Sequence, residues 1–124
     1  MRTKSSMKAM AAGAALLAVS IAPSAALAHA ALKSTSPANG STVKALPSFI
    51  KITFAEPIGR VTFVKAVDAK GVDHVVTAGL DPASAARVVA RTAKPVAGRY
   101  RVTWKIVADD GHAESGTFTF TVKK

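Results

Sequence analysis

The sequence predicts an all-β domain of about seven strands, folded as an antiparallel sandwich. Three segments alternate strictly between apolar and polar residues, so each has one dry face and one wet face. Short clusters of turn-forming residues separate the segments, and no stretch has the period of a convincing amphipathic helix. Two stacked sheets with immunoglobulin-like Greek-key topology are the natural way to bury three apolar faces in a short chain.

The individual strands follow from the same alternation. The three strongest cover residues 50–54, 100–106 and 117–122, and Trp104 is expected in the core between the sheets. Four weaker strand candidates complete the set: residues 31–36, 61–67, 74–77 and 86–92.

One segment offers a short helical alternative. In residues 81–86, Asp81 is a suitable N-cap and Pro82 suits the first helical position, so this short segment could form a single helical turn.

The first 28 residues have the order of a secretory signal peptide. Basic residues come first, a mostly apolar run covers residues 10–22, and a small-residue cleavage site follows at 26–28. The run is shorter than the roughly 20 residues that a membrane-crossing helix needs. We therefore expect cleavage after Ala28, an exported periplasmic protein that does not span the membrane, and one mature domain at 29–124.

The mature segment is small, basic and free of sulfur. Removing 28 of the 124 residues leaves 96, enough for one domain. Three of the 17 Lys and Arg residues belong to the leader, so 14 remain against 7 Asp and Glu, a net charge of +7. These residues form no cluster interleaved with aromatics, so no nucleic-acid partner is expected. Cysteine is absent and all three methionines lie in the leader, so metal ligands here are nitrogen and oxygen.

Two segments carry groups that can bind a metal. Cleavage after Ala28 makes His29 the first residue, whose α-amine and imidazole Nδ1 can hold one ion together; cleavage after Ala30 would discard it. Asp110 and His112 lie two apart, so in extended backbone their side chains leave on the same side. Asp-Gly between two strands is equally a strong hairpin signal that needs no function.

The candidate ligands supply three nitrogens and carboxylate oxygen. This set suits a tetragonal Cu(II) site, and copper binds such ligands most strongly among the first-row divalent ions, so one Cu(II) per chain is expected. His74, near a predicted hairpin, is a weak candidate for a second ion. The candidate ligands of the main site are His29, Asp110, His112 and, more weakly, Glu56 at the end of a strand.

Several short motifs are spread over residues 29–124. They are an amino-terminal His-Ala, a Ser-Pro-Ala-Asn-Gly-Ser stretch ending at Ser41, Ile-Thr-Phe-x-Glu-Pro at 52–57, Tyr-x-Val-x-Trp at 100–104, and Asp-Gly-His followed by Gly-x-Phe-x-Phe at 116–120. Together they resemble the CopC family of periplasmic copper-binding, copper-resistance proteins. The resemblance implies a seven-stranded cupredoxin-like or immunoglobulin-like barrel-sandwich with a Cu(II) site at the amino-terminal histidine.

The resemblance also implies roles for particular residues. His29 matches the amino-terminal ligand, Asp110 and His112 match an Asp-x-His pair, and Glu56 matches a glutamate near the cupric site of some members. Some relatives carry a cuprous site in a methionine-rich loop, and the corresponding loop here has no methionine.

Three functional hypotheses follow. The leading one is a non-enzymatic, monomeric Cu(II)-binding protein for copper sequestration, delivery or resistance, with an inner-membrane copper transporter or another envelope copper protein as partner. The second is a copper oxidoreductase, because an amino-terminal histidine on copper also resembles the site of lytic polysaccharide monooxygenases. The third is a metal-free immunoglobulin-like interaction module, in which the Asp-Gly-His segment is a plain hairpin.

Overall fold

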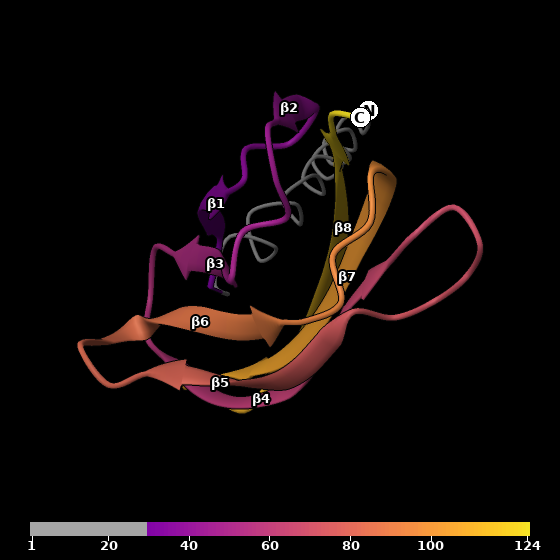
Figure 1. The fold of residues 1–124 in the computed structure, drawn as a ribbon. Coiled ribbons are helices and arrows are strands. Elements are labelled where there is room, and N and C mark those ends of the chain that lie inside the picture. The colour runs from indigo at the N-terminus through magenta and orange to yellow at the C-terminus, as the bar shows by residue number, and fades with distance from the viewer. Residues whose placement is uncertain (1–29) are drawn as a thin grey trace, which may run out of the picture.

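The computed structural model describes residues 30–124 (Figure 1). The predicted signal peptide, its cleavage site and His29 lie outside the described residues. Strands account for most of this range, and no helix within it is long and apolar enough to cross a membrane. The strands are β1 (Leu32–Ser36), β2 (Ser41–Val43), β3 (Phe49–Phe54), β4 (Ile58–Val67), β5 (Val75–Asp81), β6 (Ser84–Thr92), β7 (Gly98–Ala108) and β8 (Ala113–Val122).

The strands form two four-stranded sheets. One has the order β1-β3-β6-β5 and the other the order β2-β8-β7-β4. Figure 1 shows the long strands β7 and β8 running side by side, with β3 and β6 in the other sheet. Every pairing is antiparallel except β2 with β8, which is parallel. The predicted all-β sandwich is confirmed.

Strand β2 was not predicted from the sequence. It has only three residues, which is too short for the alternation of apolar and polar residues to stand out, and it follows directly on a turn-rich segment. Its pairing with β8 is what makes it a strand, and the backbone of Gly40 continues that contact by donating to the carbonyl of Thr119 at 2.7 Å.

The core fills the space between the two sheets. Trp104 is 5% exposed, as predicted, and its ring meets that of Phe54 edge-on with centroids 5.0 Å apart. Tyr100 and Phe120, paired across β7 and β8, stack with their centroids 5.2 Å apart. Alternate residues of the long strands are buried, which is the burial that the alternation predicted.

The helical turn that residues 81–86 could have formed is not present. Asp81 ends β5 and Ser84 begins β6, so the segment is a β-hairpin. The Asp81 carboxylate accepts a hydrogen bond from the backbone N–H of Ala83 at 2.9 Å, which caps a turn in the way that it would have capped a helix. Its other oxygen pairs with Arg87 at 3.0 Å. Pairing between β5 and β6 decided between two local conformations that the sequence permits.

Candidate metal centre

The connection between β7 and β8 is a tight turn that contains Asp110, Gly111 and His112. The backbone N–H of Ala108 donates to the carbonyl of His112 at 2.8 Å, and the N–H of Gly111 donates to the carbonyl of Ala108 at 2.9 Å. Gly111 has a φ of 94°, a conformation that residues with a Cβ rarely adopt. The hairpin that the Asp-Gly signal predicted is therefore present.

The same turn brings Asp110 and His112 together. His112 Nδ1 lies 3.2 Å from Asp110 Oδ1, and this oxygen also accepts the backbone N–H of His112 at 3.1 Å. The Asp110 side chain is 42% exposed and the His112 side chain is 63% exposed, so both face solvent. The turn thus presents a carboxylate and an imidazole next to each other at one end of the sandwich. Their neighbourhood was expected, but it comes from the turn and not from the extended backbone that the spacing argument assumed.

The corner between β3 and β4 lies against this turn. Ile58, the first residue of β4, pairs with Ala108. The backbone N–H of Asp109 donates to the carbonyl of Pro57 at 3.3 Å. Glu56, the weaker candidate ligand, is the exposed residue just before this proline. The contact places Glu56 at the same end of the sandwich as Asp110 and His112.

The described chain begins at this corner as well. Ala30 is 3% exposed, and the carbonyl of Ala31 accepts a hydrogen bond from the N–H of Ala55 at 2.7 Å. Ala55 immediately precedes Glu56. The start of the described chain, the β3–β4 corner and the β7–β8 turn are therefore connected by two backbone hydrogen bonds.

The donor groups of the described residues do not make a metal site by themselves. Within residues 30–124, no group of three or more His, Asp or Glu side chains is close enough to hold one ion. The Asp110–His112 pair offers one oxygen and one nitrogen ligand, which matches the oxygen and nitrogen preference of a divalent transition ion rather than that of a soft cuprous ion.

His74 does not fit a second metal site. It is 5% exposed and lies edge-on to the ring of Tyr100. Its Nε2 is 2.8 Å from Asp68 Oδ2 and its Nδ1 is 3.1 Å from the carbonyl of Ala93. Two acceptors facing the two ring nitrogens favour the doubly protonated imidazolium, which cannot ligate a metal.

The pKa values of this pair follow from the same contacts. Burial on its own would lower the pKa of His74, but the hydrogen bonds to Asp68 and to the Ala93 carbonyl outweigh burial, so that the pKa of His74 is raised. The hydrogen bond from His74 holds the pKa of Asp68 below its usual value, helped by the backbone N–H groups of Val72 and Lys70. The histidine thus has a structural role in joining two loops.

Glu114 is a carboxylate near the turn that sequence reasoning missed. It is the second residue of β8, it pairs with the buried Ile106, and its Oε2 is buried. The signal was available in the sequence, because Glu114 stands two residues after His112 and in step with Phe118 and Phe120 on the inward face of the strand.

The chain matches known proteins over nearly all of the described residues. The model of the CopC domain family matches residues 32–123. Copper resistance protein C from Escherichia coli is 36% identical over 109 residues, which cover 79% of this chain and 84% of that protein. Copper resistance protein C from Xanthomonas campestris pv. juglandis is 29% identical over 116 residues, 87% of this chain and 91% of that protein.

Solved structures agree with the fold. PcoC, a methionine rich copper resistance protein from Escherichia coli, superimposes with a TM-score of 0.63 at 31% identity, over 77% of this chain and 100% of that chain. CopC from Methylosinus trichosporium OB3b superimposes with a TM-score of 0.69 at 23% identity, over 77% of this chain and 94% of that chain. With the family model and the Escherichia coli relative each spanning most of the sequence, the chain belongs to the CopC family of copper resistance proteins.

Proposed function

We propose that this protein is exported, binds one Cu(II) ion per chain and sequesters or delivers it without catalysing a reaction. The observation that carries the proposal is the exposed Asp110–His112 pair, which lies at the end of the sandwich where the described chain begins. Cleavage after Ala28 would make His29 the new first residue, directly before the buried Ala30. Its α-amine and imidazole would add two nitrogens to the pair.

The donor set favours copper in its cupric state. Amine, imidazole and carboxylate ligands suit Cu(II), which they bind more strongly than the other first-row divalent ions. The chain has no cysteine, and no methionine after Met10, so it lacks the soft ligands that select Cu(I). This distinguishes it from the methionine rich PcoC. The names of the relatives, copper resistance protein C, support the same metal.

The geometry also suits a carrier. The β7–β8 turn holds Asp110 and His112 in place through backbone hydrogen bonds, so little conformational entropy has to be lost when an ion binds. Both side chains are exposed, which leaves the ion accessible to a recipient such as an inner-membrane copper transporter or another envelope copper protein. A coordinating Asp110 would occupy a position that oxygen needs, which favours binding over the oxidoreductase hypothesis.

An intact mass spectrum of the exported protein, with and without Cu(II), tests the proposal. We expect a chain that begins at His29 and gains one copper ion. A mature chain that begins at Ala31, or a chain that takes up no copper, would overturn the proposed site.

A second experiment isolates the α-amine. Adding one alanine ahead of His29 displaces the amine while leaving the sandwich intact, and we expect this extension to abolish stoichiometric Cu(II) binding. The cupric absorption and electron paramagnetic resonance spectra report the ligand set, and circular dichroism reports the fold. Unchanged copper spectra in the extended protein would show that the amine is not a ligand.

A further inference from the structure

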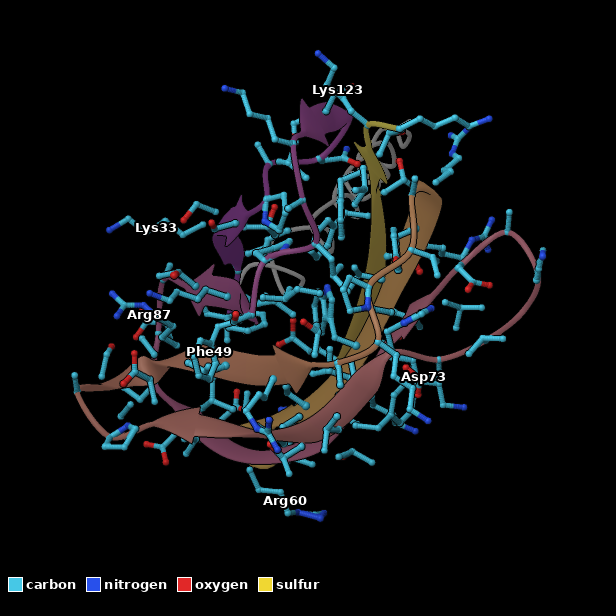
Figure 2. All side chains as sticks on the ribbon, viewed as in Figure 1. Lys33, Phe49, Arg60, Asp73, Arg87 and Lys123 are labelled. Atoms are coloured by element: carbon cyan, nitrogen blue, oxygen red, sulfur yellow. The ribbon has the colours of Figure 1, made fainter. Side chains whose placement is uncertain are left out.

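The outward face of the β2-β8-β7-β4 sheet carries an excess of positive charge. Side chains on this face alternate with the buried ones along each strand, and register pairs Arg60 with Val107, Phe63 with Lys105, and Lys65 with Thr103. We define the basic face by its five exposed cationic side chains: Arg60 and Lys65 on β4, and Arg99, Arg101 and Lys105 on β7. Figure 2 shows Arg60 pointing away from the ribbon into solvent.

No negative charge balances these residues on the face itself. The only carboxylate on β4, β7 and β8 is Glu114, which pairs with the buried Ile106 on the opposite side of the sheet. Within residues 30–124, none of the five cations forms an ion pair. Asp68 borders the face beside Arg99 and Arg101, but its carboxylate is hydrogen-bonded to the imidazole of His74 and not to either arginine. Asp109 and Asp110 lie beyond the end of the strands, in the turn.

The opposite sheet is different. Its outward residues include Lys51, Arg87 and Arg91, of which Arg87 is already paired with Asp81 at 3.0 Å. Among the described residues, Lys33 on β1, Lys51 and Arg91 thus remain without an ion pair on that sheet, against five such cations on the basic face. The positive charge of the domain is therefore concentrated on one side of the sandwich.

The basic face extends along most of β7. Its cations run along β7 from Arg99 to the level of Val107, a distance of about 27 Å in a strand. Between and beside them stand short hydroxyl side chains, which can donate hydrogen bonds to phosphate oxygens: Thr42, Thr103, Ser115, Thr117, Thr119 and Thr121. A hollow of about 240 Å³ is lined by Arg99, Arg101 and Thr119, which could hold one phosphate group, and also by Asp68, whose carboxylate is hydrogen-bonded to His74.

We propose that the basic face docks onto a membrane rich in anionic phospholipids. A single small anion could not contact cations spread over such a length, whereas the headgroup layer of a bilayer is broad and negatively charged. The Arg60 end of the face adjoins the Ile58–Ala108 pairing, and hence the Asp110–His112 turn. Docking by this face would leave that turn at the rim of the contact, close to the bilayer and open to solvent. The proposal does not depend on copper binding.

Vesicle co-sedimentation of the full chain, in the processed form that its own cells produce, tests the proposal. The probes are vesicles of phosphatidylglycerol and phosphatidylcholine in equal parts, and vesicles of phosphatidylcholine alone, at about 0.01 M ionic strength, where the Debye length is about 30 Å. We expect binding to the anionic vesicles only, with progressive release as salt is added. Failure to bind the anionic vesicles, or equal binding to both kinds, would overturn the proposal.

Two charge-matched variants locate the contact. The face variant is Lys65→Gln with Arg101→Gln and Lys105→Gln, and the control, which also removes three positive charges, is Lys33→Gln with Lys51→Gln and Arg91→Gln. Each cation at a bilayer surface contributes about fivefold to binding, so the face variant should bind about a hundredfold more weakly and the control should lose less than about fivefold. All six residues are exposed, so circular dichroism should show unchanged folds. Equal losses in the two variants would show that net charge, rather than this face, drives binding.

An acidic protein is the competing occupant, and polyglutamate is its probe. If polyglutamate at equal total charge binds more tightly than the anionic vesicles, and the face variant loses that binding, the face belongs to an acidic protein and the membrane proposal is overturned. Weaker binding of polyglutamate supports the membrane.

Discussion

His74 Nε2 lies 2.8 Å from Asp68 Oδ2, in a contact that is 3% exposed on the histidine side chain and 10% on the aspartate. The contact joins the loop after β4 to the residue that precedes β5, and the Ala93 carbonyl holds the other ring nitrogen from the segment after β6. Three stretches of chain thus meet at one imidazole. The ring also packs against Tyr100 in the core, so the protonation state of this histidine is linked to the stability of the domain.

This linkage predicts how stability changes with pH. The pKa of His74 is raised above 6.5, so its contribution is complete below pH 6.5 and is lost as pH rises through the folded-state pKa. The pKa of Asp68 is lowered below 3.8, so its contribution is present above pH 3.8 and is lost as pH falls through the folded-state pKa. The pair should stabilise the protein most between about pH 4 and pH 6.5.

The variant His74→Gln tests this linkage. The difference in the free energy of unfolding between the original chain and the variant should be largest between about pH 4 and pH 6.5 and should shrink on either side of that range. Urea denaturation at several pH values measures it, and the titration of other groups cancels in the difference. A difference that is constant from pH 4 to pH 8 would contradict the linkage.

A second prediction concerns the close approach of Gly116 to Trp104. A Cβ at Gly116 would clash with the Trp104 ring carbon Cζ2, and a buried indole in a packed core has little room to move. We expect Gly116→Ala to destabilise the protein by about 1–3 kcal/mol through overpacking. Urea denaturation followed by the fluorescence of Trp104, the only tryptophan, measures the change.

Gly79→Ala is the matched control for that substitution. Gly79 also lies within a strand, and no atom would come within 4 Å of a Cβ placed there. The change should alter stability by no more than about 0.5 kcal/mol. Equal costs at the two positions would mean that loss of glycine in a strand, rather than the contact with Trp104, sets the effect.

A third prediction separates Asp110 from its neighbour. Asp110→Asn should weaken Cu(II) binding at least about tenfold, because the amide is neutral and a poorer metal ligand. The amide oxygen can still accept the backbone N–H of His112, so the turn should survive. Asp109→Asn, an exposed substitution in the same turn, should leave the affinity nearly unchanged. Isothermal titration with a competing chelator measures both variants, and equal losses would show that only the net charge of the turn matters.

A fourth prediction ranks Glu56. This exposed residue touches the turn only through its neighbour Pro57, whose carbonyl accepts the N–H of Asp109. We expect Glu56→Gln to weaken Cu(II) binding less than Asp110→Asn does. The same titration compares the two variants, and a loss at Glu56 as large as that at Asp110 would make Glu56 a direct ligand.

The alternation of residue types within short segments determined how much of the fold could be predicted from the sequence. The alternation of apolar and polar residues predicted β3, β7 and β8, and the buried residues of these strands are those that the pattern placed on the dry face. Where the alternating segment was short, or where the local sequence permitted two conformations, the pattern did not predict the observed structure. Ser41–Val43 is a strand only because it pairs with β8, and Asp81 caps a hairpin turn rather than a helix because β5 and β6 pair around it.

The sequence by itself determined the all-β class, the dry and wet faces of the long strands, and the hairpin turn that brings Asp110 next to His112, because each of these depends on residues a few positions apart. Tertiary structure alone decided which distant segments meet. Backbone hydrogen bonds join Ala31 to Ala55 and Pro57 to Asp109. His74 is buried beside Asp68, and the cations of β4 and β7 lie on one outward face. These contacts depend on strand order and register, which the packing of the whole core selects and no short stretch of sequence encodes.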